Sequence, residues 1–158
     1  MRKIMIGAAA LAAAFATPAM ANEFTGVRAE VTVGADSVTN GIDTTDITYG
    51  AAVGFDAEVY KNVTVGVEAN VDNVFDRRNI GASARLGLVV SDRALVYGKV
   101  GYANWEDVTS KKLDGLRVGG GLEYKLAGPL YTGVEYRYTD FDGKVGQHGA
   151  YVRVGMRF

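Results

Sequence analysis

The chain has 158 residues, with 17 basic and 18 acidic side chains, 21 glycines, two prolines and no cysteine. This length suits a single domain, and the absence of cysteine excludes a disulfide framework, a thiolate metal site and thiol catalysis. The near balance of charges argues against a nucleic-acid partner, which would require a clustered excess of Lys and Arg.

The first 21 residues have the three parts of a secretory signal peptide. Arg2 and Lys3 make a positive start, an uncharged alanine-rich run follows, and Ala19 and Ala21 flank one residue in a small-x-small cleavage site. The apolar run is shorter than the ~20 residues that span a bilayer, which argues against a membrane anchor. The sequence predicts cleavage after Ala21, so that residues 22–158 form the exported domain.

Strict period-two alternation of apolar residues runs through the rest of the chain. This spacing is typical of β-strands and cannot keep one face of a helix apolar. The alternating segments lie, in chain order, at residues 27–35, 47–57, 63–71, 80–90, 96–102, 116–126, 130–138 and 150–158. The sequence therefore predicts eight strands and no membrane-spanning helix.

The two faces of these strands differ sharply in charge. The apolar positions carry no charged residue, whereas the alternate positions are rich in glycine and carry both signs. The charged residues of the alternate face are Arg28, Glu30, Asp36, Asp56, Glu58, Glu68, Asp72, Arg85, Lys99, Arg117, Glu123, Lys125, Glu135, Arg137, Arg153 and Arg157. Alternation alone fits a soluble barrel with an apolar interior as well as a membrane barrel with a polar lumen.

Three features favour the membrane barrel. Balanced charges can pair in the narrow interior of an eight-stranded barrel, where an unpaired charge would be costly. Aromatic residues of the apolar face gather toward the strand ends, as in interfacial girdles. Short turns near residues 59–62, 91–93 and 127–129 alternate with longer polar loops near 37–43, 73–78, 106–112 and 141–147. We expect an all-β fold: a closed eight-stranded antiparallel transmembrane β-barrel with both termini periplasmic.

Ten residues of the charged face are predicted to form a lumen charge network. They are Arg28, Glu30, Glu68, Arg85, Lys99, Arg117, Glu123, Glu135, Arg137 and Arg153. At eight strands little room remains for water, so we favour a pairing network that fills the lumen over a path for solutes.

The last segment resembles the C-terminal assembly signal of bacterial outer-membrane barrels. Its Val152, Val154 and Met156 alternate back from the aromatic Phe158. Residues 95–102, 122–125 and 134–138 look like the corresponding segments of opacity-like, OmpA-type eight-stranded surface proteins.

The resemblance implies a Gram-negative outer-membrane location. It also implies outer-membrane lipids, lipopolysaccharide and the barrel assembly machinery as partners, with an unidentified surface ligand reached through the loops. The loops are shorter than those of opacity adhesins, and no peptidoglycan-binding domain follows Phe158, so adhesion and cell-wall tethering are not expected.

Few residues suggest chemistry. His148, the only histidine, could serve lipid A modification only with a serine or acidic partner, and Ser83, Ser91 and Ser110 lie on other segments. Residues 140–143 resemble a calcium loop but lack the third ligand and the acidic twelfth position. Gly119–Gly121 has no following Lys-Ser/Thr, so it is not a phosphate loop. We expect no catalytic residue, metal site or cofactor.

The sequence thus favours a structural surface protein that supports envelope integrity, with recognition by the loops. Three alternatives stay open: a narrow channel for small solutes, a lipid A-modifying outer-membrane enzyme, and a soluble periplasmic lipocalin-like binder.

Overall fold

A computed structural model describes residues 23–39, 44–74, 77–106, 112–141 and 145–158. The predicted signal peptide and its cleavage residues, Ala19 and Ala21, lie outside these ranges. None of the described residues forms a helix long and apolar enough to cross a membrane.

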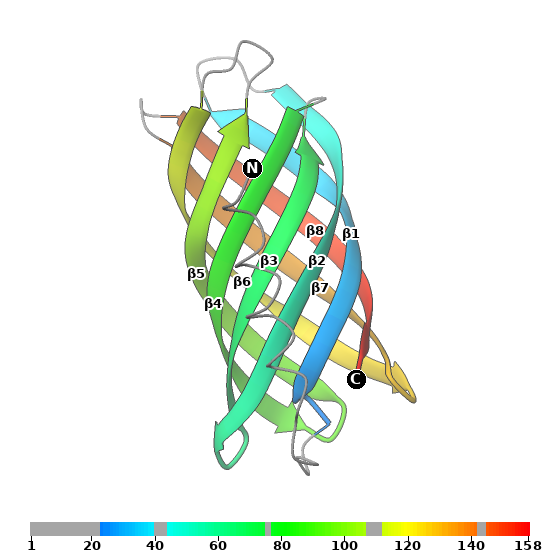
Figure 1. Cartoon of the computed structure of the whole chain (residues 1–158). Coiled ribbons are helices and arrows are strands. Elements are labelled where there is room, and N and C mark those ends of the chain that lie inside the picture. Colours follow the sequence, from blue (N-terminus) through cyan, green and yellow to red (C-terminus); the bar gives the residue numbers. More distant parts are fainter. Residues whose placement is uncertain (1–22, 40–43, 75–76, 107–111, 142–144) are drawn as a thin grey trace, which may run out of the picture.

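Eight strands make up almost all of the described chain (Figure 1). They are β1 (Gly26–Thr39), β2 (Thr44–Tyr60), β3 (Val63–Val74), β4 (Arg77–Ser91), β5 (Ala94–Glu106), β6 (Lys112–Ala127), β7 (Leu130–Phe141) and β8 (Val145–Arg157). Each strand pairs antiparallel with the next along the chain.

The sheet closes on itself because β1 also pairs with β8, from Arg28↔Arg157 to Thr39↔Gly146. Closure gives every strand a hydrogen-bonded neighbour on both sides, which removes the open edge that hydrocarbon would not tolerate. The predicted fold class, a closed eight-stranded antiparallel barrel, is confirmed.

Three tight turns lie at the same end of the barrel, at Lys61-Asn62, Asp92-Arg93 and Gly128-Pro129. In two of these turns, Asn62 and Gly128 have φ angles of 65° and 56°, which lie in the left-handed region. Next to each turn the strand register shifts by one residue, which lets a short connection join strongly twisted strands.

Several strands begin earlier than the alternation indicated. β2 begins at Thr44, β6 at Lys112 and β8 at Val145, so the predicted longer loops are shorter than expected. These added residues are largely polar. Near the loop end, outward-facing positions such as Thr45 and His148 are polar as well, so the apolar-polar contrast that marks a strand in sequence disappears.

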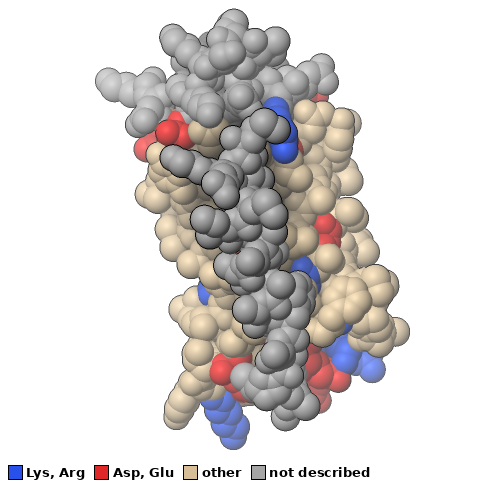
Figure 2. Space-filling model, in the orientation of Figure 1, with Lys and Arg blue, Asp and Glu red and all other residues tan. Residues whose placement is uncertain are grey.

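The barrel is apolar outside and polar inside. Along β3, for example, Val65, Val67 and Val71 are 40%, 62% and 41% exposed, whereas Glu68 is 4% exposed. Figure 2 shows an exterior that is mostly uncharged, with charged side chains gathered mainly toward the turn end. Among the described residues, the buried apolar side chains that pack together form a small cluster of Phe24, Leu95 and Tyr97.

Candidate functional site

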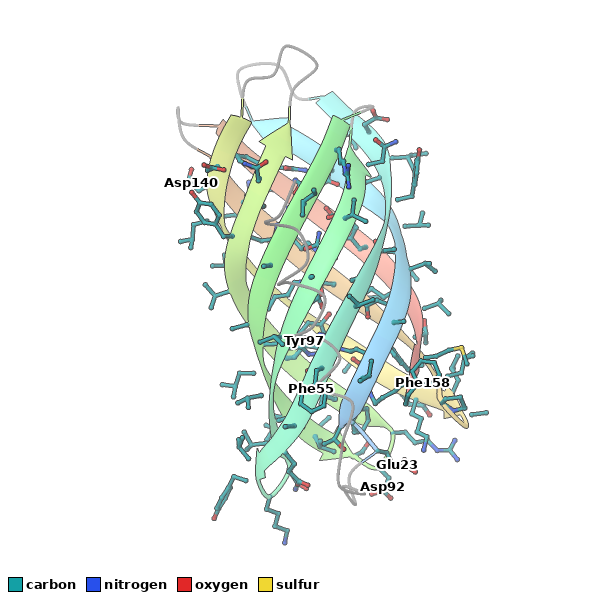
Figure 3. The ribbon with its side chains drawn as sticks, viewed as in Figure 1. Glu23, Phe55, Asp92, Tyr97, Asp140 and Phe158 are labelled. Atoms are coloured by element: carbon teal, nitrogen blue, oxygen red, sulfur yellow. The ribbon has the colours of Figure 1, made fainter. Side chains whose placement is uncertain are left out.

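The barrel interior holds the densest set of charged groups in the described chain (Figure 3). Its buried basic residues are Arg28, Arg85, Lys99, Arg117, Arg137, Arg153 and Arg157, and its buried acidic residues are Glu30, Asp36, Asp56, Glu68, Asp72, Glu123 and Glu135. With seven of each sign, these groups sum to no formal charge. A neutral set can pair internally, which offsets the cost of removing ions from water.

Two carboxylates, Glu68 and Glu135, organise the middle of the lumen. Glu68 accepts hydrogen bonds from Arg28 Nη1 at 2.8 Å and from Lys99 Nζ at 2.6 Å. Glu135 lies 2.7 Å from Lys99 Nζ and accepts from Arg153 Nη1 at 2.7 Å and from Tyr97 Oη at 2.5 Å. The Arg153–Glu135 bond joins the neighbouring strands β8 and β7. The other bonds cross the interior and join strands that are not neighbours.

Glu30 and Arg153 add a second connection beside this centre. Arg153 Nη2 donates to Glu30, and Tyr131 Oη donates to the same carboxylate at 2.5 Å. The guanidinium of Arg85 lies 3.8 Å from the ring centroid of Tyr97, a cation–π contact inside the barrel. The rings of Tyr97 and Tyr131 thus contact guanidinium groups, while their hydroxyls donate to carboxylates.

Toward the turn end, Arg157 joins two carboxylates and the start of the chain's described part. It donates to Asp56 at 2.8 Å, to Glu123 at 2.5 Å and to the backbone oxygen of Phe24 at 2.9 Å. The Phe24 side chain is 2% exposed and packs with Leu95 and Tyr97. The Phe24 side chain thus occupies this mouth of the barrel.

Toward the loop end, Asp72 and Asp36 are the acidic centres. Arg137 Nη1 donates to Asp72 at 3.0 Å, and Arg117 donates to Thr139 Oγ1 at 3.1 Å beside it. Asp36 accepts from Tyr151 Oη at 2.6 Å and from a glutamine amide of β8 at 2.8 Å. Each of these hydrogen bonds has at least one charged partner.

Lumen glycines make room for these large side chains. A Cβ built on Gly155 would lie 2.6 Å from the Tyr131 ring, and one built on Gly121 would lie 2.9 Å from the Tyr97 ring. Both distances are shorter than van der Waals contact. Glycine at these strand positions therefore allows close approach of Tyr131 and Tyr97, whose hydroxyls donate to Glu30 and Glu135.

All ten residues of the predicted lumen network lie inside the barrel and take part in ion pairs or hydrogen bonds. Four more residues join them: Asp36, Asp56, Asp72 and Arg157. The sequence could have identified these four residues as well, because they lie on the charged face of the predicted strands. Glu58 and Lys125 share that face but lie near the turns, where Lys125 pairs with Glu23 at the surface.

The residues of the predicted assembly signal lie on the outer face of β8 and just beyond it. Val152, Val154, Met156 and Phe158 are 55%, 44%, 40% and 71% exposed. Phe158 extends the pairing with β1, because its backbone N donates to Val27 O at 2.8 Å and its O accepts from Val27 N at 3.1 Å.

His148 lies on the outer face of the barrel. No serine lies close to it in the sequence. Ser83 is buried in the lumen, on the other side of the wall, but the register of β1 and β8 places Ser37 opposite His148. Only barrel closure brings these two residues together. His148 Nδ1 is bonded to Tyr136 Oη at 2.5 Å, and the described residues contain no Ser37–His148 hydrogen bond.

The other chemistries weighed from the sequence, calcium binding and phosphate binding, have no site in the described residues. They hold no group of three or more His, Cys, Asp or Glu side chains that could bind a metal. Residues 142–144, part of the calcium-like stretch, lie outside them. Gly119–Gly121 lies within β6, so it begins no helix.

An apolar exterior around a neutral, charge-filled interior defines a transmembrane β-barrel of the outer-membrane type. A family model described as "Outer membrane protein beta-barrel domain" matches residues 7–158, and the chain belongs to this family. A search of curated proteins finds no match.

Solved outer-membrane barrels share the fold at low sequence identity. The N-terminal β-barrel domain of Pseudomonas aeruginosa OprF is 15% identical with a TM-score of 0.60, covering 85% of this chain and 99% of that one. Ail, the attachment invasion locus protein of Yersinia pestis, solved with a heparin analogue, is 15% identical with a TM-score of 0.58, covering 84% and 99%. The outer-membrane enzyme PagL is 12% identical with a TM-score of 0.54, covering 82% and 99%.

Family membership fixes the location and the orientation. The protein lies in the bacterial outer membrane, with the short turns, the start of β1 and the end of β8 on the periplasmic side. The loop end faces outward. Because the structural relatives include an enzyme, the shared fold alone does not assign an activity.

Proposed function

We propose that this protein is a non-enzymatic structural component of the outer membrane, which supports envelope integrity and presents four connections at the cell surface. The observation that carries the proposal is the filled interior. The central carboxylates Glu68 and Glu135 each pair with two or more buried cations. A barrel stiffened by such pairing is suited to a mechanical role in the membrane.

The outer face supports the non-enzymatic assignment. A serine–histidine nucleophile requires a hydrogen bond from the hydroxyl to the base and a third group that orients the base. Here Tyr136, on the neighbouring strand, occupies His148 Nδ1. Incubating the purified barrel with lipid A and measuring the lipid's mass tests this assignment; a mass change would contradict it.

The envelope role is tested in a strain that lacks the protein. We expect the strain to take up a hydrophobic fluorescent probe faster and to become more sensitive to detergent, because the outer membrane loses a stiff barrel. Expression of the parent chain should restore both. A matched variant with all four surface connections replaced by Gly-Ser linkers should restore envelope integrity but no longer bind a surface ligand. Unchanged permeability in the deletion strain would contradict the proposal.

A narrow channel is the second candidate, and buried polar atoms without partners favour it. Among the described residues these include Asp72 Oδ1, Arg137 Nη2 and Thr48 Oγ1 in the loop-side half of the lumen. Such atoms are ordinarily bonded to internal water. Swelling of liposomes in small sugars separates the candidates, since connected water would admit solutes and isolated water would not.

A further inference from the structure

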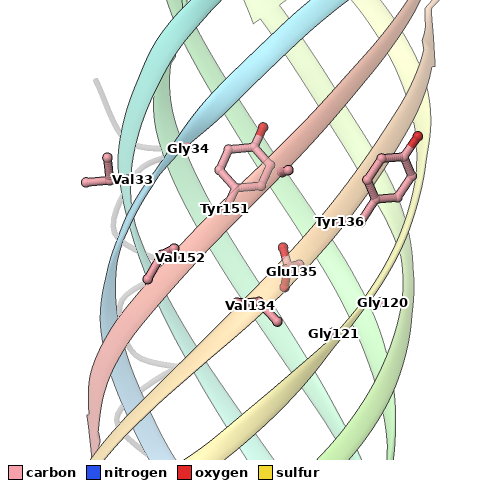
Figure 4. Close-up of a pocket in the computed structure, with 10 residues that line it drawn as sticks. Val33, Gly34, Gly120, Gly121, Val134, Glu135, Tyr136, Tyr151 and Val152 are labelled. Carbon is pink, nitrogen blue, oxygen red and sulfur yellow. The ribbon is translucent and has the colours of Figure 1, made fainter.

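The outer wall carries a shallow hollow that crosses β6, β7, β8 and β1. Its volume is about 460 Å³, and its rim includes Val33, Val134, Val152 and Tyr136 (Figure 4). All four side chains are at least half exposed in the isolated barrel, so they face the membrane. The hollow is therefore an apolar depression in the lipid-facing surface.

The strand register explains why the wall is hollowed here. Outward-facing Tyr136 of β7 has Gly120 of β6 on one side and Ala150 of β8 on the other. Ala150 in turn pairs with Ala35 of β1. The large Tyr136 ring thus has only small residues as cross-strand neighbours, so the space beside it stays open. Val134, Val152 and Val33 border that space.

One end of the hollow is bordered by polar side chains, of which only Tyr136 belongs to its lining. Tyr136 Oη is bonded to His148 Nδ1 at 2.5 Å, and the His148 ring centroid lies 4.7 Å from that of Tyr138. Ser37 lies opposite His148 in the register of β1 and β8. His148 and Tyr138 lie closer to the loop ends of their strands than Ala150 and Tyr136 do. The polar end consequently faces the extracellular side.

We infer that this surface is a binding site for lipid A, the acylated glucosamine phosphate that anchors lipopolysaccharide in the outer leaflet. One acyl chain lies in the hollow against Ala150 and Tyr136. The sugar hydroxyl or phosphate groups at the head of that chain accept or donate hydrogen bonds at His148, Tyr138 and Ser37. An apolar depression with a few convergent polar groups at one end is the usual form of a lipid or small-molecule site.

Two observations favour this occupant over a second protein copy or a periplasmic-leaflet phospholipid. The hollow is continuous with the face that already meets membrane lipid, and its polar end lies on the extracellular side, where lipid A headgroups lie. The inference depends on the membrane orientation of the barrel and deepens the proposed envelope role, because a retained lipid A molecule would join the barrel to the outer leaflet.

A smaller apolar hollow elsewhere on the wall provides the control. It has a volume of about 280 Å³ and is formed by β2 and β3 around Ala51, Val53, Ala69 and Val71. Its lining includes no histidine or tyrosine. Ala69→Leu fills this control hollow as Ala150→Leu fills the first, and both alanines are exposed on the outer face.

The test is native mass spectrometry of the folded barrel, released from detergent after incubation with lipid A. We expect the parent and Ala69→Leu to retain one lipid A molecule. Ala150→Leu and His148→Ala should each lower its apparent affinity by about tenfold, the effect of losing one good contact. Heat-modifiable migration on a gel, shared by all four proteins, shows that they are folded.

Three results would overturn the site. They are equal lipid A retention by Ala150→Leu and the parent, an equal loss in Ala69→Leu, and displacement of lipid A by phosphatidylglycerol or inorganic phosphate at equal concentration. Each is independent of the envelope role, because permeability of the deletion strain is measured without reference to lipid retention.

Discussion

Lys99 Nζ of β5 lies 2.6 Å from Glu68 Oε1 of β3 and 2.7 Å from Glu135 Oε1 of β7. These three strands are not neighbours in the barrel wall. A single ammonium group therefore bridges the interior in two directions. Such links oppose flattening of the barrel's cross-section, because they connect distant parts of the wall. The hydrogen bonds within the wall join only adjacent strands.

The first prediction concerns this bridge. Lys99→Met should lower the free energy of unfolding by about 3–5 kcal/mol, because it leaves two buried carboxylates with one partner fewer. Reversible urea unfolding in phospholipid vesicles, followed by tryptophan fluorescence, measures the change. Lys125→Met is the control, since its partner Glu23 is half exposed and such a pair contributes at most about 1 kcal/mol. Equal losses in the two variants would show that the buried lumen pairs contribute no more to stability than the exposed pair does.

The second prediction compares two strand glycines on opposite faces of the wall. Gly155→Ala should cost about 1–3 kcal/mol, because the added methyl group overlaps the Tyr131 ring and the backbone oxygen of Ala29. Gly98 faces outward, and a Cβ there would come no closer than 3.9 Å to the Gly119 backbone oxygen. Gly98→Ala should leave stability unchanged or raise it slightly. The same unfolding measurement applies, and a reversed order would contradict the packing described for the lumen.

The third prediction tests which face meets lipid. Val67 lies in the middle of β3 and is 62% exposed, so Val67→Arg should cost about 2–4 kcal/mol at the bilayer midplane. Val59→Arg, beside a periplasmic turn, should cost no more than about 1 kcal/mol. Glu68→Gln should weaken lumen pairing without depending on membrane thickness. If Val67→Arg were as stable in vesicles as the parent, the assignment of the two faces would be reversed.

The fourth prediction concerns assembly in cells. Phe158→Ala keeps the backbone hydrogen bonds to Val27 but removes the exposed ring that the assembly machinery is proposed to recognise. We expect periplasmic precursor to accumulate, while folding in detergent changes little. Immunoblots of fractionated cells measure the distribution. Phe55→Ala, another aromatic change on the outer face, should assemble normally; an equal defect in both variants would remove the specific role of Phe158.

The sequence predicted the strands, their two faces and the burial of the charged face, because period-two alternation is a local property of the chain. Partners could not be predicted in the same way. Arg28 pairs with Asp56 and Glu68 on β2 and β3, and this choice depends on strand tilt and stagger, which alternation does not encode.

Two features needed the closed barrel before they could be seen. Ser37 and His148 are 111 residues apart in the chain and meet only because β1 pairs with β8. Phe24 precedes the first strand as a single apolar residue without periodic neighbours. Its burial in the periplasmic mouth depends on Leu95, Tyr97 and Arg157, which come from strands far along the chain.

The fifth prediction concerns conductance across the barrel. The proposed structural role requires that the paired charges and Phe24 close the lumen to ions. Single-channel recording of the parent protein in a planar phospholipid bilayer tests this requirement most directly. The expected result is an electrically silent barrel whose insertion is verified by heat-modifiable migration of the recovered protein. Steady, voltage-independent conductance steps from the parent would contradict it and establish a continuous aqueous path through the lumen.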